Sequence, residues 1–222
     1  MVEQRLVGSG PPDRRMADIR VEYETDGLAK AETHPDPVAQ FDRWLAEAVE
    51  SGVPQANAMT LATAGLDGQP SARVVLLKGY GEEGFVFYTN LESRKSRELR
   101  ENPRASLCFL WLDLHRQVRI EGSVGRVEAG EADRYFDSRP RDSRIAASVS
   151  PQSREVPDRA TLERMMEEVK DSPDQVYRPS YWGGWRVRPD RFEFWQGRLH
   201  RLHDRIVYLK EDEGWRRIRL AP

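Results

Sequence analysis

The sequence predicts an α+β protein whose centre is an antiparallel split β-barrel, closed or nearly closed, with helices packed around it. Two observations favour this fold class. Strand-like segments follow one another with tight turns between them, as at 66–70 (LDGQP) and 81–84 (GEEG). The strand–helix–strand alternation that builds a parallel sheet is missing. We expect a flexible tail over residues 1–19 and a single domain over residues 20–222.

In the first half of the chain the hydrophobic period changes from helical to strand-like. Phe41, Trp44, Leu45 and Val49 recur at helical spacing and predict a helix over 37–53. The segments that follow are short and apolar, and turns separate them. They predict strands at 58–64, 71–78 and 85–89, a polar helix at 93–102 that Pro103 ends, and strands at 105–112 and 117–127.

In the second half, helices come first and strands return at the end. Leu162, Met165, Met166 and Val169 form one apolar stripe, which predicts an amphipathic helix over 158–170. Two shorter helices are expected before it, at 128–138 and 141–149. The closing strands are expected at 185–187, 191–195, 202–209 and 215–220.

The charge balance argues against a nucleic-acid-binding protein. The 222 residues include 35 Lys and Arg against 37 Asp and Glu, for a formal net charge of −2, whereas binding to a phosphate backbone needs an excess of positive charge. The longest purely apolar run, 107–112, is far too short to span a membrane. The first residues lack the apolar stretch of a secretory signal, so we expect a cytoplasmic protein.

Cysteine and histidine usage predicts neither a disulfide nor a metal site. Cys108 is the single cysteine, so no internal disulfide is expected. The four histidines have no cysteine partners and no metal-type spacing. The glycine-rich loops GxGxxG and GxxxxGK[ST] are also missing from the sequence, so any phosphate site must be built differently.

The segment 87–98 (FYTNLESRKSRE) predicts an anion site at the start of a helix. A strand ends there, and a helix begins near Ser93 with Arg94 and Lys95 in its first turn. Free backbone N–H groups and the helix dipole favour a negative charge at this point. Two cations there oppose the dipole unless an anion lies between them. The alternative is a basic helix start that faces solvent.

Arg73 and Lys78 bracket the apolar strand 73–78 (RVVLLK) and suggest a charged ligand at its ends. Their spacing of five places them on opposite faces of a regular strand. They share one ligand only through a bulge, a strong twist or a ligand that wraps around the strand end. The alternative is that both side chains extend to solvent from the barrel rim.

The segment 193–205 (EFWQGRLHRLHDR) gives the strongest indication of a ligand. On the expected strand, Arg201, His203 and Arg205 line one face, where three cationic groups repel one another unless an anion binds there. Trp195 offers a flat surface on which a planar heterocycle stacks. Ion pairs with Asp204 are the alternative, but Asp204 is expected on the other face.

A further clamp for phosphate is expected in 134–144 (RYFDSRPRDSR). Tyr135 and Arg139 are four residues apart and share a helix face, and Ser143 follows. A phenol and a guanidinium that converge on one point suit a phosphate. The residues alone therefore indicate two anion sites and an aromatic platform, which suit a planar phosphorylated ligand.

At these residues the sequence resembles the pyridoxine/pyridoxamine 5′-phosphate oxidase family of flavin enzymes. The resemblance runs from about Arg20 to Pro222. It rests on motifs that occur in the order and spacing of the family: RVVLLK, FYTNLESRK, RQV, YFDSRPRDS, VSPQS, YWGGWRV, EFWQG, RLHDR and the terminal RLAP.

The resemblance implies a split-barrel homodimer with FMN bound at the subunit interface. It assigns FMN binding to Arg73, Val74, Val75, Leu76, Lys78, Tyr88, Thr89, Arg94, Lys95, Gln117, Gln152, Ser153, Trp195 and Arg205. It assigns substrate binding to Arg20, Tyr23, Lys78, Tyr135, Arg139, Ser143, Arg201 and His203.

The reaction that the resemblance implies is oxidation of pyridoxine 5′-phosphate and pyridoxamine 5′-phosphate to pyridoxal 5′-phosphate. A hydride passes from C4′ to the flavin, and O2 reoxidises the flavin with release of hydrogen peroxide, and of ammonia from the amine. Arg201 and His203 are the expected catalytic residues. Arg201 orients the substrate, because a guanidinium does not lose its proton at neutral pH. His203 is expected to accept a proton.

Two departures from the family pattern bear on the substrate side, where Val21 and Ser148 replace a common basic residue and a common aromatic one. Two alternative functions stay open. One is a related FMN oxidase on the same scaffold, of the phenazine-biosynthesis type. The other is a non-catalytic protein that binds FMN or pyridoxal phosphate.

Overall fold

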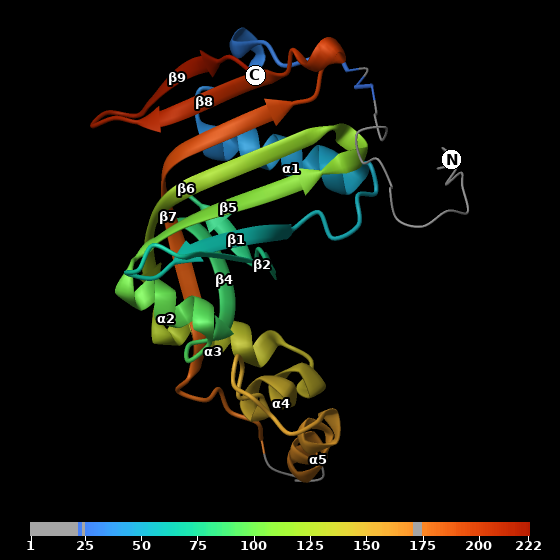
Figure 1. Cartoon of the computed structure of the whole chain (residues 1–222), viewed down its shortest axis with the longest axis vertical. Coiled ribbons are helices and arrows are strands. Elements are labelled where there is room, and N and C mark those ends of the chain that lie inside the picture. Colours follow the sequence, from blue (N-terminus) through green and yellow to red (C-terminus); the bar gives the residue numbers. More distant parts are fainter. Residues whose placement is uncertain (1–21, 24, 171–174) are drawn as a thin grey trace.

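One strongly curled antiparallel sheet organises the protein (Figure 1). The computed structural model describes residues 22–23, 25–170 and 175–222. Within these residues the sheet has nine strands in the order β2–β1–β5–β6–β7–β4–β3, with β8 paired to β7 and β9 to β8. The strands are β1 (Ala58–Ala64), β2 (Pro70–Leu76), β3 (Gly79–Gly81), β4 (Gly84–Asn90), β5 (Arg104–Trp111), β6 (Arg116–Arg126), β7 (Trp182–Gln196), β8 (Asp204–Lys210) and β9 (Trp215–Leu220).

Strand β7 is shared by two parts of the sheet, and this sharing explains why the barrel is split. Its first half pairs with β4 and its second half with β8, while β6 accompanies it along its length. The register of β6 and β7 shifts at Gly122, which lies opposite Pro189. A Cβ at Gly122 would lie 2.0 Å from the carbonyl oxygen of Arg188, so only glycine fits there. A bulge of this kind bends the strand and lets one strand pair with two parts of the sheet.

Helix α1 (Pro37–Glu50) covers one face of the curled sheet and supplies the centre of the core (Figure 1). The helix begins with Asp36, whose carboxylate accepts a hydrogen bond from the backbone N–H of Val38 at 3.0 Å. Phe41 is fully buried, and its ring centroid lies 5.0 Å from that of Phe85. Trp44 packs edge-on against Phe194 at 5.3 Å. These contacts fix the helix against β4 and β7, two neighbouring strands of the sheet.

The remaining helices lie away from β8 and β9 (Figure 1). A second, smaller core of Phe136, Ile145, Val176 and Trp182 joins them to β7. No helix in the described part of the chain is both long and apolar enough to cross a lipid bilayer. These helices are α2 (Arg94–Glu101), α3 (Ala129–Ser138), α4 (Arg141–Val149) and α5 (Arg159–Lys170).

The predicted fold class is confirmed, and some local expectations are wrong. The strands expected at 185–187 and 191–195 are one strand, β7, because Pro189 lies at the bulge. The strand expected at 202–209 begins only at Asp204, because His200 and Arg201 have left-handed φ angles of 56° and 61°. The strand expected at 71–78 ends at Leu76, and the short strand β3 was not expected.

Candidate functional site

A cavity of about 650 Å³ gathers most of the predicted site residues. It lies between β2, β4 and the helices α2 to α4. Four cationic side chains line it and no carboxylate does, so its electrostatics favour an anion. The lining residues are Arg73, Val74, Val75, Leu76, Lys78, Tyr88, Thr89, Asn90, Lys95, Tyr135, Arg139, Pro140, Ser143, Ala146, Ala147, Ser150, Gln152 and Trp182.

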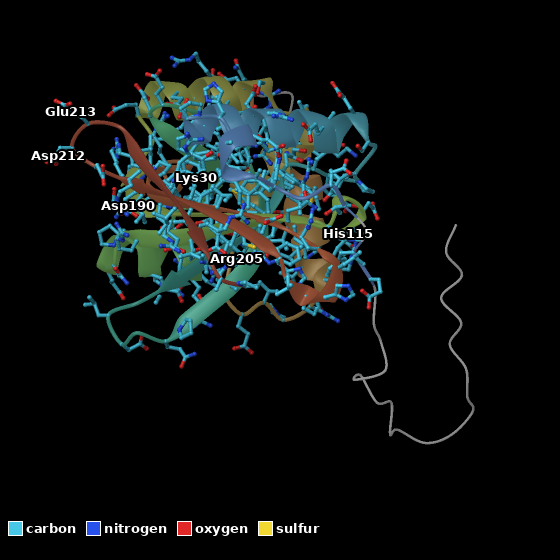
Figure 2. The ribbon with its side chains drawn as sticks, turned by 90° about the horizontal axis from the view of Figure 1, so that it is seen from above. Lys30, His115, Asp190, Arg205, Asp212 and Glu213 are labelled. Atoms are coloured by element: carbon cyan, nitrogen blue, oxygen red, sulfur yellow. The ribbon has the colours of Figure 1, made fainter. Side chains whose placement is uncertain are left out.

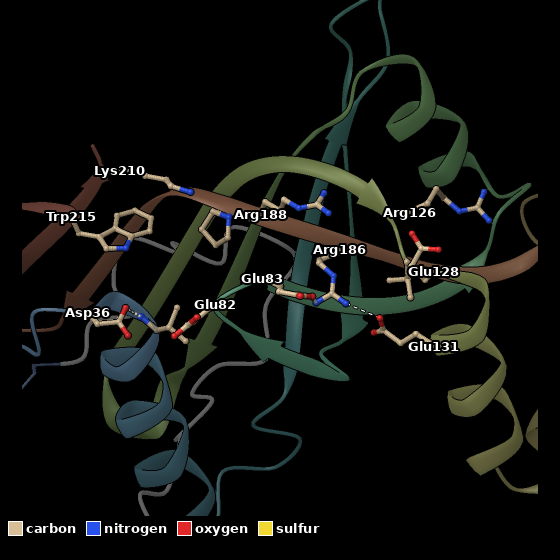
Figure 3. Close-up of a pocket in the computed structure, with 13 residues that line it drawn as sticks. Asp36, Glu82, Glu83, Arg126, Glu128, Glu131, Arg186, Arg188, Lys210 and Trp215 are labelled. Carbon is tan, nitrogen blue, oxygen red and sulfur yellow. Dashed lines mark hydrogen bonds and ion pairs between the residues drawn. The ribbon is translucent and has the colours of Figure 1, made fainter. Parts of the chain in front are cut away.

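A second cavity of similar size, about 620 Å³, carries both charges: the cations Arg126, Arg186, Arg188 and Lys210 line it together with acidic side chains (Figure 3). Its walls include the carboxylates of Glu82, Glu83, Glu128 and Glu131. Arg186 already has partners there, at 2.7 Å from Glu131 and 3.2 Å from Glu83. An anionic ligand would meet negative charge in this cavity. We therefore place the predicted phosphates in the first one.

The start of α2 forms the first group of donors in the site. The Ser93 hydroxyl donates to the carbonyl of Asn90 at 2.6 Å and does not cap the helix. The Lys95 ammonium donates to Gln152 Oε1 at 2.9 Å and to Thr89 Oγ1 at 3.2 Å. Burial, together with the charge of Arg73, lowers the pKa of Lys95 to about 8. A bound phosphate would stabilise the charged form.

Arg73 and Lys78 reach the same cavity because β2 ends between them. On a regular strand the two side chains would point to opposite faces. Because β2 ends at Leu76, Lys78 lies beyond the strand, and both cations line the same cavity. The shared-ligand interpretation of RVVLLK therefore fits the structure.

The clamp predicted from Tyr135 and Arg139 lies at the other wall of this cavity. Helix α3 ends at Ser138, Arg139 follows it, and Ser143 lies on α4. Tyr135 stacks on Tyr88 with ring centroids 4.0 Å apart.

Arg139 has a donor without an acceptor. Its guanidinium carbon lies 4.9 Å from the ring centroid of Trp182. Its Nη1 is buried and has no hydrogen-bond partner among the described residues, and burial lowers the pKa of this guanidinium. This half-buried cation therefore has an N–H group free to donate to an acceptor that enters the cavity.

Most of the other predicted residues form a second cluster, on and beside β6, β7 and β8. Gln117, Trp195 and Arg205 are neighbours across β6, β7 and β8. The ring of His203 lies 4.6 Å from that of Trp195, and Tyr23 packs against His203 at 5.6 Å. Figure 2 marks His115 and Arg205 at this end of the sheet. A small cavity of about 190 Å³, which Tyr23, Gln117 and Trp195 help to line, lies here.

The row of three cations expected on one strand face is wrong. Arg201 lies in a turn before β8, and its guanidinium carbon is 6.0 Å from the ring centroid of Tyr23. Arg205 has an ion partner that the sequence analysis missed, since its Nε donates to Glu193 Oε1 at 2.8 Å. Burial raises the pKa of Glu193, but the hydrogen bond from Arg205 and the charges around it lower the pKa overall.

Some predicted residues lie outside both clusters. Arg94 and Ser153 do not line the 650 Å³ cavity, and Ser148 turns its hydroxyl to the carbonyl of Ile145 at 2.8 Å. Arg20 and Val21 lie outside the described residues. Trp182, which forms part of the cavity wall, was not predicted as a site residue. The motif YWGGWRV, which contains Trp182, is the sequence signal that could have indicated it.

The fold and the site together define a class: a split-barrel protein that binds a phosphorylated, planar ligand in a cation-lined cavity. A family model described as pyridoxamine 5′-phosphate oxidase matches residues 45–172. One described as pyridoxine 5′-phosphate oxidase C-terminal dimerisation region matches residues 182–222 and indicates a homodimer. The chain belongs to the pyridoxine/pyridoxamine 5′-phosphate oxidase family and is an FMN-dependent oxidase.

Curated relatives and solved structures agree with this family. Pyridoxine/pyridoxamine 5′-phosphate oxidases of Rubrobacter xylanophilus and Burkholderia multivorans are each 53% identical over 211 residues. These matches cover 94% and 93% of this chain and 97% and 99% of the relatives.

Two structures share the fold. PhzG from Burkholderia lata, in complex with tetrahydrophenazine-1-carboxylic acid, is 32% identical with a TM-score of 0.84, and the match covers 89% of this chain and 98% of PhzG. An FMN-binding protein from Nostoc punctiforme, related to pyridoxamine 5′-phosphate oxidase, is 17% identical with a TM-score of 0.68. That match covers 82% of this chain and 97% of the other.

The residues present fit FMN as the cofactor. The cavity has the size of a ligand site, no carboxylate lines it, and its lining includes the end of β2 and the start of α2. The neutral backbone and apolar side chains of Val74, Val75 and Leu76 form the wall between Arg73 and Lys78.

Proposed function

We propose that the chain oxidises pyridoxine 5′-phosphate and pyridoxamine 5′-phosphate to pyridoxal 5′-phosphate. The observation that carries this proposal is the buried Nη1 of Arg139, which lacks an acceptor in a cavity that Lys78, Tyr135 and Ser143 also line. A phosphate monoester on the substrate would supply that acceptor. The names of relatives that are 53% identical support the same substrates.

The site has room for two phosphates because it has two groups of donors. We assign the flavin phosphate to Arg73 and Lys95, with Gln152, and the substrate phosphate to Lys78, Tyr135, Arg139 and Ser143. Arg94 and Ser153, which the resemblance adds to the flavin phosphate, lie beside this group but do not line the cavity. Bound FMN would accept the hydride that leaves C4′ of the substrate and pass its electrons to O2. The chain itself holds the two phosphates so that C4′ lies against the flavin ring.

A second copy of the chain would complete the site. Lys95 lines the 650 Å³ cavity, whereas Trp195 lines the separate cavity of about 190 Å³. Trp182, at the start of β7, lines the Lys95 cavity, whereas Trp195 lies near the far end of the same long strand, where each residue adds about 3.3 Å. We therefore place FMN between two subunits. One subunit binds its phosphate, and Gln117, Trp195 and Arg205 of the partner subunit contact its other end.

His203 is better suited to donate a hydrogen bond than to accept a proton. The backbone N–H of Arg198 donates to its Nδ1 at 3.1 Å, which places the proton of the neutral ring on Nε2. Burial and the charge of Arg201 lower the pKa of His203, so the ring stays neutral near pH 7. We propose that Nε2–H of His203 donates to the substrate, and that Arg201 orients the substrate by its charge.

An anaerobic reaction tests the proposed function. Pyridoxine 5′-phosphate or pyridoxamine 5′-phosphate is added to the FMN-loaded protein without oxygen, and the visible absorbance of the flavin is recorded. We expect the flavin to bleach, its colour to return when air is admitted, and pyridoxal 5′-phosphate to appear. A flavin that stays oxidised with both compounds contradicts the substrate assignment.

The likeness to PhzG favours one specific alternative, an oxidase that acts on a phenazine precursor. Such an enzyme needs the flavin residues but has no use for a clamp of Tyr135, Arg139 and Ser143. Bleaching by a reduced phenazine carboxylic acid, without bleaching by either vitamin phosphate, would establish this alternative. A protein that binds FMN and pyridoxal 5′-phosphate but shows no turnover with either class would be a carrier.

A further inference from the structure

Glu98 is a buried carboxylate beside a site that binds anions. It lies on α2, and its side chain is only 10% exposed. A negative charge next to a phosphate site repels the ligand and is also costly to bury. Its presence there therefore calls for a specific function.

The Glu98 carboxylate accepts hydrogen bonds on both of its oxygens. Oε2 accepts from the hydroxyl groups of Thr63 and Ser71, each at 2.6 Å. Oε1 accepts from Nε of Arg94 at 2.8 Å. Although burial alone would raise the pKa of Glu98, these donors and the charge of Arg73 lower it to about 2. The group is an acceptor at every pH at which the protein works.

The direction of these hydrogen bonds links Glu98 to Arg73. Each hydroxyl has one proton, which it gives to Glu98, so its lone pairs are free to accept from elsewhere. Arg73 supplies those donors: Nη1 donates to Thr63 Oγ1 and Nη2 to Ser71 Oγ. Nη2 also lies 3.4 Å from Glu98 Oε2. The orientation of Arg73 thus depends on a group that only accepts.

We propose that Glu98 is a positioning residue for the flavin phosphate: its carboxylate, which Arg94 contacts from outside the cavity, holds the guanidinium group of Arg73 at the phosphate end of the site. The inference rests on the proposed assignment of the flavin phosphate to Arg73 and Lys95. Glu98 does not touch the flavin itself, because it does not line the cavity.

The substitution Glu98→Gln tests the proposal with almost no change in shape. In one orientation of the amide, Nε2–H faces Arg94 Nε–H. In the other, it faces hydroxyl groups that already accept from Arg73. In the first orientation Arg94 loses its acceptor, and in the second the hydroxyl groups turn their protons away and Arg73 Nη2 loses its contact with Oε2. Simple electrostatics makes the opposite prediction, since removing a negative charge beside a phosphate should tighten FMN binding.

The measurement compares FMN with riboflavin, which lacks the phosphate. Each flavin is titrated into the flavin-free full-length protein, and its fluorescence gives the dissociation constant. For Glu98→Gln we expect FMN to bind about tenfold more weakly, the effect of losing one charge-assisted hydrogen bond, while riboflavin affinity stays constant. Glu101→Gln, an exposed glutamate on the same helix, is the matched control and should change neither affinity.

Two outcomes overturn the proposal: FMN binding that is unchanged or tighter in Glu98→Gln, or an equal loss for FMN and riboflavin. If Glu98→Gln does not fold, Ser71→Ala removes one link between Glu98 and Arg73 while the carboxylate keeps its other donors. This variant should weaken FMN about threefold and leave riboflavin unaffected. If the native protein binds both flavins equally, the assignment of the phosphate site itself is wrong, and the role of Glu98 is wrong with it.

Discussion

Lys95 is the cation of the phosphate site whose charge depends on pH near neutrality. Its pKa is lowered from 10.5 to about 8, first by burial and then by Arg73, while Glu98 opposes the shift. Because the folded pKa is the lower one, the protonated form reduces the stability of the flavin-free protein below about pH 8. That cost disappears as the pH rises from about 8 toward 10.5.

FMN binding should therefore weaken as the pH rises above about 8. Below this pH the ammonium is already charged, whereas above it binding requires uptake of a proton, and the affinity falls by up to about tenfold per pH unit. FMN titrations between about pH 7 and 9 measure this slope. In Lys95→Met the affinity should be lower and independent of pH. A native protein with constant affinity over this range would contradict the prediction.

Arg139 illustrates a conflict between stability and function at a single residue. Substitution by Met removes a buried donor that has no partner, and the thioether keeps the contact with the Trp182 ring. We expect the unfolding free energy of the flavin-free protein not to fall, and KM for pyridoxine 5′-phosphate to rise about 10- to 100-fold.

Thermal unfolding and steady-state kinetics of Arg139→Met measure the two effects separately. Arg134→Met, at an exposed position on α3, the helix that ends just before Arg139, is the control and should leave KM unchanged. A large loss of stability in Arg139→Met would show that the guanidinium serves the fold and not the substrate.

At the scale of elements, the bulge between β6 and β7 allows β7 to pair with β4 in its first half and with β8 in its second half. At Gly122 a Cβ would meet the backbone of Arg188 and Pro189, which cannot move without breaking the ladder. At Gly125 the nearest atom, at 2.6 Å, is the end of the flexible Arg188 side chain. Gly122→Ala should lower the free energy of unfolding by about 2 kcal/mol or more, and Gly125→Ala by much less. Denaturant titration of both variants provides the comparison, and equal losses would contradict it.

Periodicity in the sequence predicted the elements well where each strand has its own turn signals. The bounds of β1, α4 and β9 are the predicted ones. It failed at β7, because a proline inside an apolar segment normally ends a strand, and only the partner strand reveals that Pro189 lies opposite a glycine bulge. The prediction also failed at residues 199–203. His200 and Arg201 have left-handed φ angles there, and no glycine in the sequence indicates such a turn.

At the scale of the whole molecule, sequence reasoning found the two groups of ligands but not their separation. The motifs around Lys95 and Arg139 were expected to form two anion sites, and the structure brings both to one cavity. Nothing in a linear sequence says that Trp195 lines a separate cavity. The partner of Arg205, Glu193, was missed for the same reason: the two residues are brought together by the pairing of β7 and β8.

The two-subunit site predicts complementation between inactive variants. Lys95→Met removes a phosphate ligand, and Trp195→Ala removes the platform that the partner subunit would supply. In a mixed dimer one site carries both substitutions and the other carries neither. Random reassociation of equal amounts should therefore restore about a quarter of the native activity. Activity that stays at the level of the separate variants would show that one subunit forms a complete site.

The stack of Tyr88, Tyr135 and Trp182 also has an optical consequence. The Trp182 ring lies 5.5 Å from Tyr88 and beneath the guanidinium of Arg139 at 4.9 Å, inside the cavity that receives the phosphates. Its ultraviolet emission should therefore change when a ligand neutralises that guanidinium, before any flavin absorbance is lost. The chain carries its own fluorophore at the entry point of the substrate, so a stopped-flow trace recorded at two wavelengths would time arrival and oxidation separately.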